Sequence, residues 1–187
     1  MTQPPTVGGS ERIRLFLGLR LPSAALDVVE AWQHAHLERM RIVPREQLHL
    51  TLAFLGHRPA ADLPAVLEAL RAAAGGAEGE LRLTPVRYRE TRSVAMLVCV
   101  DECGRAGALA ADLQERLERA GVYRKEARPW LSHLTVGRFR EQPGLSADLA
   151  NMGTYVLIPS DASAYLSRLR PSGAEYEVLA SVALGGR

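Results

Sequence analysis

Two blocks of the sequence share a pattern: "QLHLTLAFLG" (residues 47–56) and "LSHLTVGRF" (residues 131–139). Each contains His-Leu-Thr followed by an aliphatic residue, starting at His49 in the first block and at His133 in the second. The chain has five histidines, so random placement gives well under one such match. Polar and apolar residues alternate in both blocks, which indicates strands. The repeat therefore limits the fold to one that holds two similar strands.

Alternation within a strand decides which side chains of the two motifs point the same way. Residues two positions apart lie on the same face of a strand. His49 and Thr51 therefore share one face, and the leucines around them share the other. The same holds for His133 and Thr135. We expect the aliphatic faces to anchor both strands in a core and the polar faces to line a cleft.

The rest of the sequence predicts short strands and three helices. Many short strands separated by turns favour an α+β fold with antiparallel pairing. Ser23 is the expected N-cap of the first helix. Because each motif strand follows a helix-containing segment, we expect two similar lobes. The predicted strands are 12–21, 48–56, 79–90, 93–102, 132–140 and two within 154–185 around a turn at 171–173; the predicted helices are 22–40, 59–76 and 107–121.

The composition is typical of a globular protein, with 47% hydrophobic residues, 24% charged residues and a formal net charge of +2. No apolar run reaches the roughly 20 residues that span a bilayer, so we expect no membrane contact. Residues 1–10 are rich in Pro, Gly and Thr and contain no secretory signal. We therefore expect a mobile tail there and a cytoplasmic protein. Arginine greatly outnumbers lysine, which we attribute to codon usage rather than to function.

Sequence motifs for metal or nucleotide cofactors are missing. Cys99 and Cys103 do not have Cys-x-x-Cys spacing and are expected to be reduced thiols. Each His-x-Thr motif supplies one metal ligand, and no His-Glu-x-x-His or similar pair completes a site. A Gly-rich phosphate loop ending in Gly-Lys is also missing. We therefore expect neither a metal nor a cofactor.

Two histidines on opposite sides of one site can act together as acid and base. The unperturbed pKa of histidine is about 6.5, so one ring can be neutral while the other is protonated near neutral pH. One ring takes a proton from a nucleophile while the other gives a proton to the leaving oxygen. The threonine hydroxyls can hold non-bridging phosphate oxygens. This set suits displacement at phosphorus and needs no metal.

Four blocks follow one another along the chain: "RLFLGLRLP" (14–22), "VPREQLHLTLAFLG" (43–56), "RPWLSHLTVGR" (128–138) and "SRLRPSGAEYEVLASVAL" (167–184). Together the blocks extend over nearly the whole chain after the first ten residues, which makes them far more specific than His-x-Thr alone. In this order they resemble the two-histidine (2H) phosphoesterases, and specifically the bacterial and archaeal RNA 2′,3′-cyclic phosphodiesterases once called 2′-5′ RNA ligases.

The resemblance implies one bilobal α+β domain over residues 11–187, with two antiparallel sheets flanked by helices and the active site in the central cleft. It implies hydrolysis of RNA 2′,3′-cyclic phosphate ends to 2′-phosphomonoesters without metal. Carried over to this sequence, His49 is the proton donor to the leaving 3′ oxygen and His133 is the base that activates water. Thr51 and Thr135 bind phosphate oxygens. We expect a monomer whose partners are RNA ends or related nucleotides.

Four other residues near the motifs are singled out by their type and position. Arg138 ends the second motif and is a further candidate for substrate binding. Strict alternation places Arg138 on the face away from the motif histidine, whereas a bulge at Gly137 would return it to the same face; both remain open. Phe54 and Trp130 can stack on a base, but we expect both in the core. Arg128 is expected to be a solvated loop residue.

Three alternatives to RNA cyclic phosphate hydrolysis remain at this point. The same two histidines can run the reaction backwards and join RNA ends by a 2′-5′ linkage. A small cyclic nucleotide phosphate can replace RNA as the substrate. The chain can also be a binding module for phosphorylated RNA ends that has no turnover. The paired His and Thr residues argue against the last alternative, because a pure binder has no need of two proton shuttles.

Overall fold

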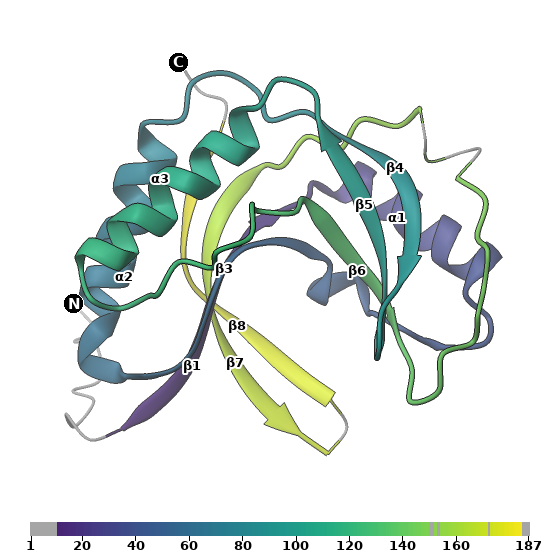
Figure 1. Ribbon diagram of the computed structural model, residues 1–187, viewed down its shortest axis with the longest axis horizontal. Coiled ribbons are helices and arrows are strands. Elements are labelled where there is room, and N and C mark those ends of the chain that lie inside the picture. Colours follow the sequence, from purple (N-terminus) through teal and green to yellow (C-terminus); the bar gives the residue numbers. More distant parts are fainter. Residues whose placement is uncertain (1–10, 150–151, 153, 172, 185–187) are drawn as a thin grey trace.

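The computed structural model describes residues 11–149, 152, 154–171 and 173–184 (Figure 1). The expected tail over residues 1–10 lies outside the described residues. Short 3₁₀ turns precede β3 and α2. The elements are β1 (Arg12–Arg20), α1 (Ser23–His36), β2 (Arg41–Ile42), β3 (His49–Pro59), α2 (Leu63–Gly75), β4 (Leu83–Glu90), β5 (Val94–Asp101), α3 (Arg105–Arg119), β6 (His133–Arg138), β7 (Asp161–Arg170) and β8 (Gly173–Ala183).

The strands of the described residues form one antiparallel sheet in the order β4-β5-β6-β3-β1-β7-β8, with β2 paired to β6. The two motif strands β3 and β6 are neighbours at its middle. They share a single pair in the ladder, Leu50 opposite Leu134, and diverge on either side of it (Figure 1). This contact joins the β4-β5-β6 half to the β3-β1-β7-β8 half.

Helices α2 and α3 lie side by side against one face of the β3-β1-β7-β8 half (Figure 1). Strand β1 shows why that face is the core. Leu15, Leu17 and Leu19 are buried, while Arg12 and Arg20 at its ends are exposed. Phe16 and Gly18, on the opposite face, are buried as well, so the middle of β1 is covered on both sides.

Helix α1 packs on the other half of the sheet, although it directly follows β1. Its Trp32 ring lies 6.0 Å from the ring of Tyr88 in β4. The indole N–H of Trp32 donates to the carbonyl of Asp148, 2.8 Å away, in the loop before β7. Each half of the sheet therefore has its own helical layer. The two motif strands lie where the two halves meet.

The predicted α+β fold with two lobes and antiparallel pairing is confirmed. The lobes share one continuous sheet rather than forming two separate ones, because β3 and β6 pair at Leu50 and Leu134. The short strand β2 was not predicted, since two residues carry no periodic signal. The expected Ser23 cap is wrong: Pro22 holds the N-cap position, and its carbonyl accepts the first two helical N–H bonds.

None of the helices in the described residues is long and apolar enough to cross a bilayer. Among the same residues, no three or more His, Cys, Asp or Glu side chains form a group that could hold a metal ion. Cys99 is a buried free thiol and Cys103 an exposed one.

Candidate active site

The four motif side chains gather where β3 and β6 meet. His49 and His133 are the first residues of these strands. Leu50 lies opposite Leu134 in an antiparallel pair. On either side of this pair, His49 is therefore on the side of Thr135, and Thr51 is on the side of His133. All four side chains leave the sheet on the face away from the buried leucines. The two motifs are therefore related by an approximate two-fold axis through the Leu50–Leu134 pair.

The two imidazoles are held in the same way, each by the carbonyl two residues earlier in its own strand. The Nδ1–H of His49 donates to the carbonyl of Gln47 over 2.7 Å. The Nδ1–H of His133 donates to the carbonyl of Leu131 over 2.9 Å. A carbonyl oxygen only accepts, so Nδ1 carries a proton in both rings and Nε2 is the nitrogen left for chemistry.

An aromatic cluster encloses His49. The ring of Phe16 lies 4.7 Å away, that of Tyr176 5.6 Å and that of Tyr165 5.7 Å. On the neighbouring strand β1, Gly18 gives room for the imidazole. A Cβ at Gly18 would lie 3.1 Å from Cδ2 of His49. The ring position is thus fixed on several sides by packing.

This enclosure changes the acidity of His49. Burial is the main cause that lowers the pKa of His49 to about 4, and the positive charges of His133 and Arg138 lower it further. The hydrogen bond to the carbonyl of Gln47 acts in the opposite direction. The His49 ring is therefore neutral at neutral pH in the ligand-free protein, with a free lone pair on Nε2.

A β-bulge follows the first motif and reorients the residues after it. In the pairing of β3 with β1, Thr51 lies opposite Gly18 and Phe54 opposite Phe16, so Leu52 is an extra residue. Gly18 and Phe16 share a face of β1, and Phe16 contacts His49 on that face. Phe54 therefore lies on the same face as His49 and Thr51.

The second motif carries a matching bulge. Met96 of β5 lies opposite Thr135 and Val94 lies opposite Arg138, so β6 has one extra residue between them. Since Val94 and Met96 share a face, Arg138 shares the face of Thr135. Its charge lowers the pKa of His49, as expected for a guanidinium near that ring. Of the two positions left open for Arg138, the structure therefore shows the one that a bulge gives, on the face of the motif histidine.

Two buried glutamines that were not predicted as site residues support these bulges. Gln114 of α3 donates from Nε2 to the carbonyl of Leu52 over 2.8 Å. Gln33 of α1 donates from Nε2 to the carbonyl of Val136 over 2.7 Å. Both carbonyls belong to the third residue after a motif histidine. The sequence did contain a signal for them, because each glutamine lies on the apolar stripe of its helix. A glutamine buried there needs a hydrogen-bond partner.

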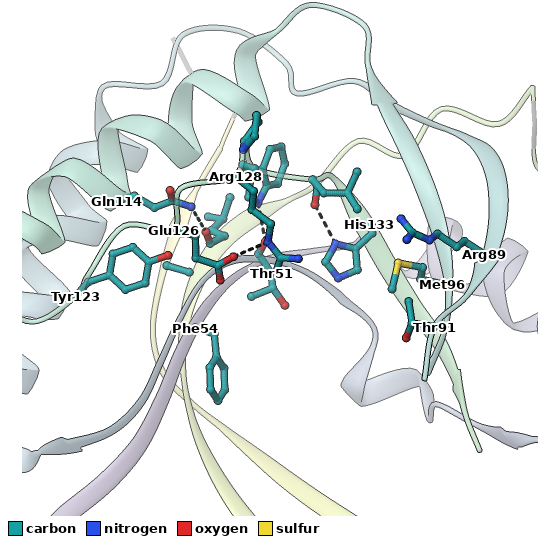
Figure 2. A pocket seen from close by; sticks show the side chains of 15 residues that line it. Thr51, Phe54, Arg89, Thr91, Met96, Gln114, Tyr123, Glu126, Arg128 and His133 are labelled. Atoms are coloured by element: carbon teal, nitrogen blue, oxygen red, sulfur yellow. Dashed lines mark hydrogen bonds and ion pairs between the residues drawn. The ribbon is translucent and has the colours of Figure 1, made fainter. Parts of the chain in front are cut away.

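A hollow of about 390 Å³ opens beside the motif strands (Figure 2). Thr51 and His133 line its inner end, and Tyr123 and Gln114 line the side under α3. The volume is within the range of small-molecule sites. His49, Thr135 and Arg138 are not among its lining residues. A second, much smaller hollow lies at Arg138. Arg41, Gln47 and Gly173 are among the residues that line it.

One of the two aromatic residues beside the motifs differs from expectation, whereas Trp130 packs against the core. Phe54 is 48% exposed and lines the hollow, so its expected place in the core is wrong. Trp130 is half-buried and also lines the hollow, with its Nε1–H donating to the carbonyl of Thr51 over 2.9 Å. Arg128 is solvated as expected and pairs with Glu126 at 2.6 Å at the rim (Figure 2). The bond from Trp130 to Thr51 connects the loop that carries Trp130 to the first motif strand.

The hydroxyls of the motif threonines are not engaged by other described groups of the protein. Neither Thr51 nor Thr135 uses its hydroxyl in a hydrogen bond within the part of the chain that the structure describes. The same is true of the two Nε2 atoms of His49 and His133. Four groups with hydrogen-bonding capacity thus face one region between two strands.

A sequence model of the 2′-5′ RNA ligase superfamily matches residues 21–162. The chain belongs to this superfamily. The match includes both His-x-Thr motifs, and it confirms the resemblance to the two-histidine phosphoesterases. No curated protein matches the sequence.

Several solved structures have the same fold. E. coli LigT in its apo form superimposes with a TM-score of 0.75 at 24% identity, over 95% of this chain and 100% of LigT. E. coli LigT complexed with NADP+ gives 0.73 at 25% identity, over 95% and 100%. TT0787 of Thermus thermophilus gives 0.68 at 28% identity, over 92% and 98%. The expected two-histidine phosphoesterase fold is therefore confirmed.

Proposed function

We propose that this superfamily member hydrolyses RNA 2′,3′-cyclic phosphodiester ends to 2′-phosphomonoesters without a metal. The observation that carries the proposal is the pair of histidines on adjacent strands, each with Nδ1 bonded to its own strand and Nε2 left free. Each lies next to the other motif's threonine. The proposal treats residues 11–187 as one domain that acts as a cytoplasmic monomer.

The chemistry follows from what each free group can do. A water molecule attacks phosphorus while Nε2 of His133 takes its proton. The bond from phosphorus to the 3′ oxygen breaks, and His49 gives a proton from Nε2 to that oxygen. The products are a 2′-phosphomonoester and a 3′-hydroxyl. Thr51, Thr135 and Arg138 hold the non-bridging oxygens and stabilise the charge that grows on them.

The acidity of His49 sets a condition on this assignment. Its pKa of about 4 leaves the ring neutral before the substrate binds. A proton donor must be protonated, so His49 has to gain its proton as the cyclic phosphate arrives. The negative phosphate favours the charged ring, because an opposite charge nearby raises the pKa of a histidine.

The same observation favours a second assignment, in which neutral His49 is the base and His133 the donor. A substrate whose leaving 3′ oxygen is replaced by sulfur separates the two, because a thiolate leaves without a proton. If His49 is the donor, His49→Ala regains most of its lost rate on the sulfur substrate while His133→Ala does not. The reverse result exchanges the two roles.

Nucleotide ligands of a relative are consistent with a nucleotide substrate. E. coli LigT, at 25% identity, has been crystallised with NADP+ and with ATP. Both ligands carry phosphates on a nucleoside. A cyclic phosphate on a ribose presents the same two components to the two motifs and to the hollow beside them.

The direct test is phosphorus NMR of an RNA oligomer that ends in a 2′,3′-cyclic phosphate, with EDTA present. We expect the native protein to form a 2′-monoester. His49→Ala and His133→Ala are each expected to lose roughly 100- to 10,000-fold in rate, the range for general acid–base groups. His34→Ala is the matched control, because His34 is an exposed residue of α1.

The outcomes of that experiment separate the alternatives. A 3′-monoester would reverse the leaving oxygen while keeping the site. Loss of activity with EDTA would contradict the metal-free mechanism. Binding of the cyclic end without product would favour the binding module, and turnover of a mononucleotide alone would favour a small cyclic nucleotide substrate. Joined oligomers in place of hydrolysed ends would favour ligation.

A further inference from the structure

Strand β1 exposes a second feature next to the histidines. Arg12, Arg14 and Phe16 alternate with the buried leucines and share the face that carries His49. On β3, Phe54 lies opposite Phe16 and His57 lies opposite Arg14. Phe16 itself is buried in the aromatic cluster around His49. We call the four residues Arg12, Arg14, Phe54 and His57 the open face.

No helix covers the open face within the described residues. Helices α2 and α3 contact the other side of these strands (Figure 1). The same side of the sheet continues into β7 and β8, where Leu169 is 65% and Val178 45% exposed. Exposed apolar side chains on β3, β7 and β8 indicate a binding surface rather than a solvated edge.

Positive charge on the open face has little compensation. Arg12 donates to the carbonyl of His57 over 2.8 Å, and Arg14 donates to the hydroxyl of Ser167. Neither has a carboxylate partner in the described part of the chain, whereas Arg168 on the opposite side pairs with Glu177. On the side of the sheet that carries the open face, the acidic residue of β7 is Asp161. Its carboxylate lies 3.8 Å from the guanidinium of Arg20.

Phe54 and Arg14 form a unit suited to nucleotides. The guanidinium carbon of Arg14 lies 4.7 Å from the centre of the Phe54 ring. Bases of single-stranded RNA stack on aromatic rings and on arginine planes. An arginine against one side of an exposed ring therefore offers a stacking surface and a phosphate partner in the same place.

The open face is continuous with the candidate active site. Phe54 lines the same hollow as Thr51 and His133 (Figure 2). From Gly18, which lies opposite Thr51, strand β1 leads through Phe16 and Arg14 to Arg12. At about 3.3 Å per residue, this row extends roughly 20 Å from the motifs. That length accommodates a few nucleotides of an extended strand.

We propose that the open face binds the single-stranded RNA that leads to the reacting end. Phe54 stacks on the base next to the reacting phosphate, and Arg14 and Arg12 contact successive phosphates upstream. The proposal rests on the proposed function for the identity of the reacting end, and it adds the surface that binds the RNA chain before that end. Oligonucleotides are then preferred over mononucleotides.

The first test measures binding without turnover. A fluorescent RNA octamer with a 3′-monophosphate end is titrated with native protein and with the double variant Arg12→Gln, Arg14→Gln, at several salt concentrations. Each phosphate contact contributes a slope of about −0.7 to log affinity against log salt for single strands. We expect the slope of the double variant to be less negative by about 1.4, because two phosphate contacts are lost. At 0.1 M salt the double variant should bind roughly 25-fold more weakly.

The matched control places the same substitutions on the helical side. Arg71→Gln, Arg119→Gln changes two exposed arginines of α2 and α3. We expect this variant to bind with the native affinity and slope. Equal losses in both double variants would overturn the proposal, because the effect would then be that of net charge. Arg14→Lys keeps the charge, and we expect it to keep the salt slope while losing affinity.

Phe54 is tested by two substitutions that differ in the ring. Phe54→Ala is expected to weaken octamer binding roughly 5- to 100-fold, the range for loss of one base–aromatic stack. Phe54→Leu keeps an apolar side chain without a ring, and we expect a similar loss. Phe54→Tyr is expected to bind as the native protein does. Native binding by Phe54→Leu would contradict stacking.

Failure of the proposed function and failure of this inference give different results. Absence of cyclic phosphate hydrolysis with intact, salt-dependent octamer binding at the open face would reject the function alone. Hydrolysis with no difference between octamer and mononucleotide, in either rate or affinity, would reject the RNA surface alone. A shift in molecular mass by light scattering in native protein, abolished by Phe54→Ala, would show that the face binds a second copy of the chain and overturn the inference.

Discussion

The side chain of Gln114 in α3 donates a hydrogen bond of 2.8 Å to the backbone carbonyl of Leu52 in β3. Leu52 is the extra residue of the bulge after the first motif. Gln33 of α1 makes the equivalent bond to Val136 after the second motif. The bulges turn Phe54 and Arg138 onto the same side as the histidines. A buried amide from each helical layer thus fixes the geometry of both ends of the site.

Replacement of Gln114 by Leu should therefore impair both stability and activity. The variant keeps a similar volume but leaves the Leu52 carbonyl without its donor. A buried polar group without a partner costs about 1–3 kcal/mol. We expect that loss in urea unfolding, together with a fall in kcat/KM on RNA cyclic ends as Phe54 shifts. Glu115→Leu, at an exposed neighbouring position, is the control, and equal behaviour of the two variants would contradict this role.

Much of the site was predictable from the two motifs, because strand alternation fixes which of their residues share a face. His49 with Thr51, and His133 with Thr135, follow from a period of two. The α+β fold followed from the order of periodic segments. These inferences depend on local pattern alone, and the structure agrees with them.

The positions beyond the motifs were not predictable in the same way. Strict alternation places Phe54 with the buried leucines, but one extra residue in the ladder reverses every face after it. Nothing in "HLTLAF" distinguishes a bulged strand from a regular one. The carbonyl of the bulged residue Leu52 is bonded to Gln114, which is far away in the sequence. The single β3–β6 pair also depends on the meeting of two distant strands, as does the enclosure of His49.

Arg138 provides a test of the second bulge. Its positive charge lowers the pKa of His49, so Arg138→Gln should raise that pKa slightly toward the ordinary value. The variant should also raise KM for RNA cyclic ends, because one phosphate partner is lost. NMR titration of the His49 ring measures the first effect. Arg140→Gln is the nearby exposed control, and no change of the His49 pKa in Arg138→Gln would contradict the assigned face.

The buried state of His49 predicts how stability depends on pH. Its pKa is about 4 in the folded protein and about 6.5 in an unfolded chain, so the unfolded chain binds more protons between these values. The contribution to stability is complete above pH 6.5 and is lost as the pH falls toward 4. The loss is at most about 3 kcal/mol.

Urea unfolding at pH 7, 5.5 and 4 measures this contribution. His49→Gln cannot titrate there, so the difference in unfolding free energy between native protein and variant should shrink as the pH falls. The slope of that difference isolates His49 from the carboxylates, which titrate in both proteins. A difference that is constant across the range would show that the ring is not buried in the neutral form.

Gly18 provides the most local test of the site, because it lies against His49 and has no side chain of its own. A Cβ there would lie 3.0 Å from the carbonyl oxygen of Leu50 and 3.1 Å from Cδ2 of His49. We expect Gly18→Ala to displace the imidazole and to lower kcat on RNA cyclic ends by roughly 10- to 100-fold. The cost in unfolding free energy should be about 1–3 kcal/mol. Gly75→Ala is the matched control, since a Cβ at Gly75 meets no atom within 4 Å in the described structure. Native kcat in Gly18→Ala would mean that the ring has freedom of movement that its packing against Phe16, Tyr165 and Tyr176 does not allow.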